Sequence, residues 1–531
     1  MSGRKWSIGV SCKAQSTAIP VGIASICNAA DHFKRPFDGW QGLSEQALPI
    51  AARLGRSQSP CTLLLQPEPH LSRVKPRRGL EIKPLIDPSS RPHRIVIVGG
   101  GAGGLALATQ LGKRWGRSGK AEVTLVDAAR THIWKPLLHQ LAAGSFDTHA
   151  EEIEFLAQAR SNHFRFRLGR LTSVDRTKHT VSLAACHDDV GLEITPAQSL
   201  HYDTLVIAIG SQTNDFGTLG AAEHTIKLDS PQAAKRFNER LINTCIRAQS
   251  VPREAGSGRL TVTIVGAGAT GVELAAEFHA SARMLATYGF DHIHPEKDLQ
   301  IALVEASPRM LSQLPERVSL AAVRELRKLS IEVHTNERVV EVKADSVRMA
   351  SGKVIQSALT VWAAGVKANE VLRTLGGDDP LETNKLNQLM VSSTLQTTRD
   401  PHIFAFGDCA ACQQPDGSWV PPRAQSAYQQ AMYLVRHLPT LVGLKPALKA
   451  PPPFIFKDQG SLVSLSEYSS VGSLMGSLTK GSLFVEGYLA RLMYWALHKQ
   501  HQFAIGGLRK TLLITLSELI DRTHRPRIKL H

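Results

Sequence analysis

Short strand-like runs of apolar and β-branched residues recur along the chain after residue 92, and most end in glycine or an acid. The clearest runs, 95–98 and 261–265, pass directly into glycine-rich sequence and then into a stretch with helical spacing. A continuous run of this kind is typical of a strand that is buried on both faces of a parallel sheet. The pattern predicts an α/β protein with two strand–turn–helix–strand units of one design.

Each unit contains a G-x-G-x-x-G turn. The first glycine permits a tight turn, the second lets the backbone approach a pyrophosphate, and the third lets the helix pack closely on the sheet. The helix N-terminus stabilises the phosphate charge. We therefore expect two dinucleotide-binding (Rossmann-type) domains in one chain. The glycines are Gly99, Gly101 and Gly104 in the first unit and Gly266, Gly268 and Gly271 in the second.

The second strand of each unit ends in an acid, Asp127 after 123–126 and Glu305 after 301–304. A carboxylate accepts hydrogen bonds from a ribose 2′-hydroxyl and repels a 2′-phosphate, so Glu305 favours NADH over NADPH. The acids follow the first glycines by 28 and 39 residues, more than the usual ~20, which requires longer crossovers. The alternatives are glycine-rich turns without a ligand and surface acids at strand ends.

Another apolar run, 404–408, ends in Gly407-Asp408. The Asp408 carboxylate can reach a ribityl hydroxyl, which indicates that one dinucleotide is a bound flavin and the other a diffusing nicotinamide. Cys409 and Cys412 follow directly, and we interpret them as structural because thiol reactivity depends on location. Since the sequence has no second C-x-x-C, a four-ligand zinc or iron–sulfur site lacks ligands, and we expect no metal.

The C-terminal part begins with a proline-rich joint near Pro451, followed by Ser/Gly-rich strand-like sequence and a basic apolar tail with 8 Lys/Arg and 3 acids from Glu486 onward. The tail predicts two basic amphipathic helices that lie in a bilayer interface. Ordinary dimer or core helices are the alternative. The apolar residues at helical spacing are Leu489, Leu492, Met493, Ala496 and Leu497, then Leu512, Leu513, Leu516, Leu519 and Ile520.

The composition of the chain limits the classes of partner that it is expected to bind. With 43% hydrophobic and 20% charged residues, the 531-residue chain is globular rather than disordered. Its net charge of +16 suggests an anionic partner, and the absence of a nucleic-acid motif favours a membrane surface over nucleic acid. No uncharged apolar run approaches the ~18 residues of a membrane-spanning helix. Seven cysteines are too sparse for a disulfide scaffold.

Several longer strings, in this order, resemble bacterial type II NADH:quinone oxidoreductase (alternative NADH dehydrogenase), a family of two-dinucleotide flavoprotein reductases. The similarity covers residues 93–531 and leaves 1–92 unmatched. The strings are 95–104, Trp134-Lys135-Pro136-Leu137-Leu138-His139, Ala269-Thr270-Gly271-Val272-Glu273, Trp362-Ala363-Ala364-Gly365, Phe406-Gly407-Asp408-Cys409 and 422–429.

The resemblance implies a role for each matching residue. Glu273 would act near the nicotinamide and flavin in proton or charge transfer. The alternative is a structural role, because the helix dipole stabilises an acid in the first helical turn. Gln425 and Gln429 stand four apart and would present two amides to quinone carbonyls, which an ordinary polar helix face would also explain. Non-covalent FAD would be held by Gly99, Gly101, Gly104, Asp127, Lys135, Asp408 and Ala424, and NADH by Gly266, Gly268, Gly271 and Glu305.

The sequence thus predicts a non-proton-pumping NADH:quinone oxidoreductase, peripheral on the cytoplasmic face of the bacterial inner membrane, with a homodimer left open. The alternatives are a soluble flavin-dependent NADH reductase of a disulfide or small redox protein, and a redox-sensing interaction module. The NADH domain should be inserted in the FAD domain. The expected ranges are 1–92 (poorly ordered or non-native extension), 93–255 and 357–450 (FAD-binding, the second part with the quinone-site helix), 256–356 (NADH-binding) and 451–531 (membrane-binding).

Overall fold

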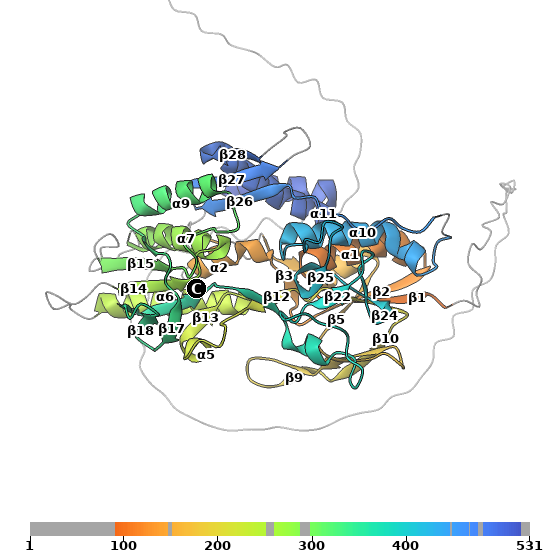
Figure 1. The fold of residues 1–531 in the computed structure, drawn as a ribbon. Coiled ribbons are helices and arrows are strands. Elements are labelled where there is room, and N and C mark those ends of the chain that lie inside the picture. The colour runs from red at the N-terminus through yellow and green to blue at the C-terminus, as the bar shows by residue number, and fades with distance from the viewer. Residues whose placement is uncertain are drawn as a thin grey trace, which may run out of the picture. The chain divides into compact units, whose positions relative to one another are not determined.

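The computed structural model describes residues 91–146, 151–250, 260–286, 298–446, 449–466, 468–475 and 482–521 (Figure 1). The expectations for the N-terminal extension therefore lie outside the described residues, apart from Arg91 and Pro92 at its end. The Leu519 side chain, one of the expected apolar positions of the tail, also lies outside them.

The first sheet has eight strands in the order β25-β22-β23-β24-β11-β1-β2-β5. At its centre β1 pairs in parallel with β2 on one side and β11 on the other. These strands are almost wholly buried, as their continuous apolar sequence predicts. The strands are β1 (His93–Val98), β2 (Ala121–Asp127), β5 (Arg165–Leu168), β11 (Thr204–Ile207), β22 (Leu389–Val391), β23 (Gln396–Thr397), β24 (Asp400–Ala405) and β25 (Ala410–Cys412).

Two helices, α1 (Ala102–Leu111) and α10 (Ala424–Leu441), lie side by side near this sheet (Figure 1). Gly103 allows their close approach, because a Cβ at this position would lie 2.5 Å from the Phe406 ring and 2.8 Å from the Ala427 carbonyl oxygen. The start of α10 is thereby held close to the first glycine-rich turn.

The second sheet has five parallel strands in the order β13-β20-β14-β15-β16. All of them fall in the chain between β11 and β24 of the first sheet, which confirms the expected insertion of one domain in the other. The strands are β13 (Thr225–Lys227), β14 (Leu260–Val265), β15 (Leu299–Val304), β16 (Glu332–His334) and β20 (Leu359–Trp362); helices α6 (Pro231–Ser250), α7 (Ala269–Ala286) and α9 (Glu316–Lys328) accompany them.

The inserted sheet extends beyond the expected range 256–356 at both ends. Strand β13 begins at Thr225 and pairs with β20, and β20 pairs with the central strand β14. Strand β13 is not followed by a glycine-rich turn of its own, so its place in the sheet depends on a long-range pairing. A three-stranded antiparallel sheet lies in the same domain: β17 (Val339–Val342), β18 (Ser346–Met349) and β19 (Val354–Gln356).

The two passages of the chain between the domains are paired with each other. Strand β12 (Ser211–Thr213) leads out of the first domain and β21 (Val366–Ala368) leads back. They form a two-stranded antiparallel ladder in which Ser211 lies opposite Ala368.

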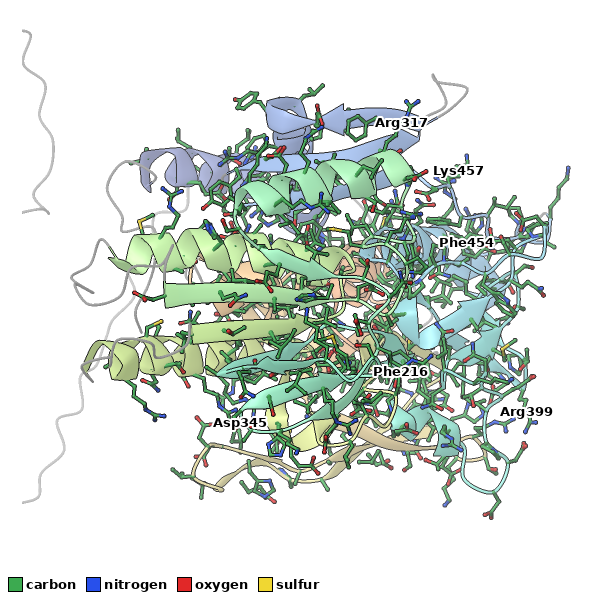
Figure 2. All side chains as sticks on the ribbon, turned by 60° about the vertical axis from the view of Figure 1, so that its left-hand side comes forward. Phe216, Arg317, Asp345, Arg399, Phe454 and Lys457 are labelled. Carbon is green, nitrogen blue, oxygen red and sulfur yellow. The ribbon has the colours of Figure 1, made fainter. Side chains whose placement is uncertain are left out.

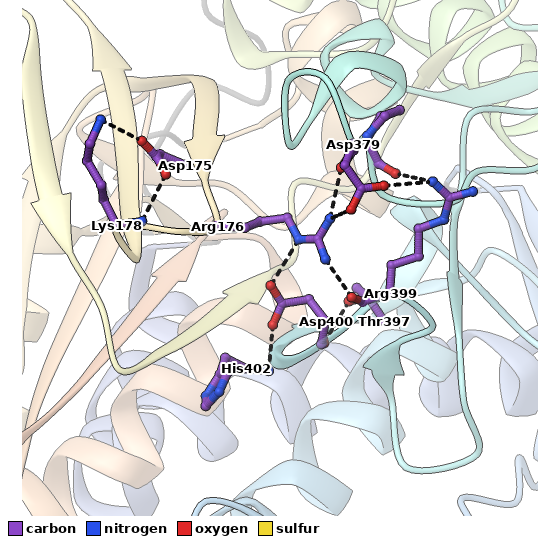
Figure 3. A network of polar contacts seen from close by, with 9 residues as sticks. Asp175, Arg176, Lys178, Asp379, Thr397, Arg399, Asp400 and His402 are labelled. Carbon is purple, nitrogen blue, oxygen red and sulfur yellow. Dashed lines mark hydrogen bonds and ion pairs between the residues drawn. The ribbon is translucent and has the colours of Figure 1, made fainter.

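An arginine clasp joins the β-hairpin that follows the first Rossmann unit to the second part of the first domain (Figure 3). Arg176 follows β6 (Arg170–Asp175) and donates from Nε to Asp400 Oδ2 at 3.1 Å. It also donates to Asp379 Oδ2 at 2.6 Å and to the Arg399 carbonyl at 2.6 Å. Three residues, Asp379, Arg399 and Asp400, therefore share one guanidinium.

The C-terminal part forms an antiparallel sheet of β26 (Gly460–Leu465), β27 (Ser469–Met475) and β28 (Ser482–Glu486), followed by the long helix α11 (Gly487–Asp521). Helix α11 is kinked at Gly507, where φ is 74° and ψ is 174°. Its surface is inverted relative to an ordinary globular helix, because several polar residues are buried while many leucines are exposed. Among the described residues, no helix is both long and apolar enough to span a bilayer.

Candidate functional site

One continuous cavity of about 1840 Å³ connects the two glycine-rich turns. The first sheet, the inserted sheet, the start of α10, the strand β26 and helix α11 all contribute side chains to its wall. Every residue that the sequence singled out for dinucleotide or quinone binding, other than the closely packed Gly271, lines this cavity. The structure therefore brings both expected dinucleotide sites and the expected quinone helix around one space.

The first turn has the backbone geometry that its motif predicts. Gly99 has a φ of 108°, and a Cβ there would lie 2.3 Å from the Ala208 carbonyl oxygen. A Cβ on Gly104 would lie 1.9 Å from the Gly99 carbonyl oxygen, so only glycine permits this contact between helix and turn. A Cβ on Gly101 would meet no atom within 4 Å. This open space lies at the N-terminus of α1, a position that favours an anionic ligand.

The second turn repeats this geometry. Gly266 has a φ of 103° and a Cβ there would lie 2.6 Å from Ala364 N, while a Cβ on Gly271 would lie 1.9 Å from the Gly266 carbonyl oxygen. Gly268, like Gly101, faces open space. The two turns are therefore equally suited to approach by a phosphate ligand.

Asp127 lies at the end of β2 beside the first turn. Its Oδ2 accepts from Gly100 N at 2.6 Å and its Oδ1 from Ala129 N at 2.8 Å. Burial raises the pKa of this carboxyl, and the backbone hydrogen bonds from Ala129 and Gly100 oppose the shift. These hydrogen bonds fix the carboxylate at the edge of the cavity, as a ribose ligand requires.

Lys135 and Asp408 are brought together through Ser211. Lys135 Nζ donates to the Ser211 carbonyl at 2.8 Å, and Ser211 Oγ donates to Asp408 Oδ2 at 2.7 Å. The three residues come from the first Rossmann unit, the outgoing domain passage and the second part of the first domain. Since all three line the cavity, they fit one ligand that extends from the first turn toward the inserted domain.

Gln430 supports this arrangement and was not identified from the sequence. It is buried, and its Oε1 accepts from Gly407 N at 2.8 Å, which holds the Gly-Asp turn in place. The sequence held one indication of its role. Gln430 directly follows Gln429, so its side chain lies further around helix α10, on the side that faces the core.

Glu273 is buried in α7 at the cavity wall. Its Oε1 accepts from Ser464 N at 3.0 Å. Burial raises the pKa of this carboxyl to about 8, and the charge of Glu277 adds to the shift. His139 Nδ1 lies 3.6 Å from Glu273 Oε2, too far for a hydrogen bond. Because burial lowers the pKa of His139 to about 4, that imidazole is neutral and supplies no counter-charge.

The two glutamines of α10 differ in their contacts. Gln429 exchanges two hydrogen bonds with the backbone of Lys457, donating to its carbonyl at 2.8 Å and accepting from its N–H at 3.0 Å. Gln425 Nε2 donates to Gln459 Oε1 at 3.3 Å, while Gln425 Oε1 is buried without a protein partner. Lys457 and Gln459 belong to the strap, residues 449–459 before β26, on which Figure 2 labels Phe454 and Lys457. Gln429 thus has a structural partner that the helical spacing did not reveal.

Helix α11 also supplies part of the wall, through Tyr494, Leu497, Gln500 and His501. The Tyr494 hydroxyl is buried without a hydrogen-bond partner. Burial raises its pKa well above the ordinary value, and the charges of Glu273 and Glu277 contribute. The sequence predicted a membrane-surface helix here, with a dimer or core helix as the alternative, and did not predict the contact with the cavity, because periodicity shows an apolar face but not what the polar face contacts.

Cys409 and Cys412 are buried free thiols of the first domain. Burial raises the pKa of Cys409 to about 12 and that of Cys412 to about 11. Neither thiol lines the cavity, which agrees with a structural interpretation. Within the described ranges, no group of three or more His, Cys, Asp or Glu side chains is arranged to hold a metal ion.

Residues 93–431 match the family of pyridine nucleotide-disulphide oxidoreductases. The type II NADH:quinone oxidoreductase of Haemophilus influenzae is 40% identical over 449 residues, which cover 82% of this chain and 99% of the relative. The Mycobacterium tuberculosis type II NADH:quinone oxidoreductase Ndh is 29% identical, covering 78% of this chain and 86% of its own. This chain belongs to the type II NADH:quinone oxidoreductase family.

Solved structures agree with this assignment at the level of the fold. Plasmodium falciparum NDH2 in complex with NADH has a TM-score of 0.70 at 20% identity, with 83% of this chain and 100% of that chain covered. The sulfide:quinone oxidoreductase of Aquifex aeolicus has a TM-score of 0.60 at 17% identity, covering 78% and 92%. The resemblance found in the sequence is confirmed, and the paired Rossmann domains are the fold of the type II NADH:quinone oxidoreductases.

Proposed function

We propose that this protein is an FAD-dependent NADH:quinone oxidoreductase that converts NADH, H⁺ and a quinone to NAD⁺ and the quinol. The observation that carries the proposal is the single cavity that joins two equivalent dinucleotide turns and the start of α10. A chain built for two independent ligands would not need one shared space. A shared space allows electrons to pass from one ligand to the next.

FAD is assigned to the first turn. Gly99, Gly101 and Gly104 shape the pyrophosphate cradle, and Asp127 is held for the adenosine ribose. Lys135, Asp408 and Ala424 lie along the same cavity toward the inserted domain, where the flavin ring and ribityl chain would extend. When bound, FAD supplies the hydride acceptor and the two-electron donor, while the protein positions the reactants and excludes water.

NADH is assigned to the second turn, formed by Gly266, Gly268 and Gly271. Glu305 Oε2 accepts from Ala267 N at 2.7 Å and Oε1 accepts from Ser307 N at 2.8 Å. A carboxylate fixed in this way can receive a ribose 2′-hydroxyl and repels a 2′-phosphate, which supports preference for NADH.

The quinone is assigned to the cavity wall formed by α10. Gln425 Oε1 is buried and unpartnered, and rotation of this amide would turn its N–H donors toward a quinone carbonyl. Gln429 fixes the strap at Lys457 and so shapes the same wall. Glu273, whose pKa is raised to about 8, holds a proton near neutral pH beside the same space. We assign it to proton transfer accompanying quinone reduction.

The exposed apolar surface of α11 supports peripheral binding to a membrane. Leu512, Leu513 and Leu516 are each more than half exposed, and exposed Arg509 and Lys510 precede them. An apolar surface bordered by cations suits an anionic bilayer interface, which we identify as the cytoplasmic face of the bacterial inner membrane. A second copy of the chain is the other partner that this surface could bind, giving a homodimer.

A flavin spectrum of the purified protein tests the function. We expect a bound flavin that is bleached by NADH, responds little to NADPH, and regains its colour when a short-chain quinone is added. If NADH bleaches the flavin and quinone does not restore its colour, the electron acceptor is a disulfide or a small redox protein instead of a quinone. Absence of flavin in freshly purified, folded protein would overturn the proposal. We also expect no acidification of sealed vesicles during turnover.

A further inference from the structure

Two buried histidines connect the C-terminal helix to the first glycine-rich turn. His501 of α11 and His132, which ends β3 (Thr131–His132), are joined Nε2 to Nε2 at 3.0 Å. His132 Nδ1 in turn lies 2.9 Å from the Gly100 carbonyl oxygen. The connection spans 369 residues of sequence and ends inside the motif Gly99–Gly104.

The hydrogen-bond directions follow from the chemistry of the partners. The Gly100 carbonyl can only accept, so His132 Nδ1 carries the proton and donates. A neutral His132 then has an unprotonated Nε2, and His501 Nε2 must be the donor to it. Burial lowers the pKa of His132 to about 4 and that of His501 well below the ordinary value, which keeps both rings neutral.

The surrounding contacts hold His501 at a fixed position. Trp134 stacks on His501 and on His498, one turn earlier in α11, with ring centroids 5.3 Å apart in both pairs. Helix α11 is kinked at Gly507, and just before the kink the carbonyl of Ile505 accepts from Gln158 Nε2 at 2.8 Å. This half of α11 is therefore fastened to the first domain.

We propose that His501 is a positioning residue for FAD, acting through His132 to orient the Gly100 peptide of the pyrophosphate turn. The Gly100 carbonyl and the N–H of Gly101 belong to one peptide plane, so fixing one fixes the other. Gly101 lines the cavity at the N-terminus of α1, where the phosphate would bind. The C-terminal helix thus completes the FAD site as well as carrying the apolar surface. This inference rests on the assignment of FAD to the first turn.

The test compares FAD affinity of the full-length apoprotein across variants, measured by quenching of flavin fluorescence on titration. His501→Ala removes the donor, and we expect the dissociation constant for FAD to rise roughly tenfold, equivalent to one lost hydrogen bond to a buried group. His501→Gln places an amide N–H near the Nε2 position and should restore most of the affinity. His501→Asn is too short to reach His132 and should behave as His501→Ala does, which keeps the test valid if the alanine variant fails to fold.

His498→Gln is the matched control, because His498 stacks on the same Trp134 but pairs with Glu151 at 3.0 Å instead of His132. We expect its FAD affinity to stay within twofold of the wild type. Equal FAD affinity in wild type and His501→Asn would overturn the inference while leaving the proposed function intact. Equal losses in His501→Asn and His498→Gln would also overturn it, by showing a general effect of helix packing. Failure of the wild type itself to bind FAD would instead refute the proposed function.

Discussion

Asp127 and Glu305 hold equivalent positions in the two domains. In each acid, one carboxylate oxygen accepts a hydrogen bond from the backbone N–H of the residue after the first glycine of the turn. The distances are 2.6 Å from Gly100 N and 2.7 Å from Ala267 N. The other oxygen of each acid accepts from the backbone N–H of the residue two positions after the acid itself, at 2.8 Å in both cases. The two sites are therefore copies of one design, and their substitutions should have separable effects.

Glu305→Gln tests the nicotinamide site. The neutral amide no longer repels a 2′-phosphate, so we expect kcat/KM for NADH to fall and that for NADPH to rise. A hydrogen bond to a charged group contributes about 1.5–3 kcal/mol, which corresponds to a loss of roughly 10- to 100-fold with NADH. Steady-state kinetics with both nucleotides measure this. Asp127→Asn is the control and should weaken FAD binding without changing the NADH/NADPH ratio; an unchanged ratio in Glu305→Gln would contradict the assignment.

Glu273 should make stability depend on pH. Its pKa is raised to about 8 in the folded protein from 4.5, so the folded state retains a proton that the unfolded state loses. Stability associated with the neutral carboxyl is complete below 4.5 and is lost as pH rises toward 8. Glu273→Gln removes this dependence. The melting temperature of Glu273→Gln should rise relative to that of the wild type as the pH increases from about 5 to about 8. A difference between the two melting temperatures that does not change with pH would show that the pKa of Glu273 is ordinary.

Gln430→Leu should weaken the flavin site without touching the ligand directly. The Gly407 N–H would lose its acceptor in a buried position, at a cost of about 1–3 kcal/mol. We expect a lower melting temperature and weaker FAD retention during gel filtration. Gln413→Leu, at an exposed glutamine that bonds only the nearby Gly417 carbonyl, serves as the control and should change neither quantity.

Arg176→Ala should destabilise the first domain. Asp400, whose side chain is 9% exposed, would lose its guanidinium partner, and we expect a loss of about 1–3 kcal/mol in the free energy of unfolding. Lys178→Ala is the matched control, because its pair with Asp175 is exposed at 77% and 38% and exposed ion pairs add little to stability. Equal denaturation midpoints for the two variants would contradict the clasp.

Leu512→Glu combined with Leu513→Glu tests the membrane surface. Both side chains are mostly exposed, so the fold should tolerate the change while the gain from apolar insertion is lost. Partitioning onto anionic vesicles should fall at least tenfold, given about 1.5–3 kcal/mol for each fully inserted leucine. Leu156→Glu, at another exposed leucine (66%) outside α11, should have no effect. Retained vesicle binding together with a change from dimer to monomer would assign the surface to a second copy.

The glycine turns were predictable because their geometry is local, and their acids because each one ends the next strand of the same unit. Positive φ at Gly99 and close packing at Gly104 follow from the order of residues in one short stretch. Strand β13 and the Gln430 contact depend on which distant segments meet, which no periodicity reports. The same holds for His501 and Tyr494, which the apolar period of the tail placed on a helix without indicating that the helix faces the cavity.

The paired passages β12 and β21 have a mechanical consequence. The ladder holds the two passages in register, and the segment that ends in α2 (Leu138–Ala143) adds a second connection by packing against α6 and α7 of the inserted domain. Ser211 belongs to that ladder, and it also contacts Lys135 and Asp408. A displacement of this ladder would therefore also displace the hydrogen bonds that Ser211 makes with Lys135 and Asp408 on the flavin side.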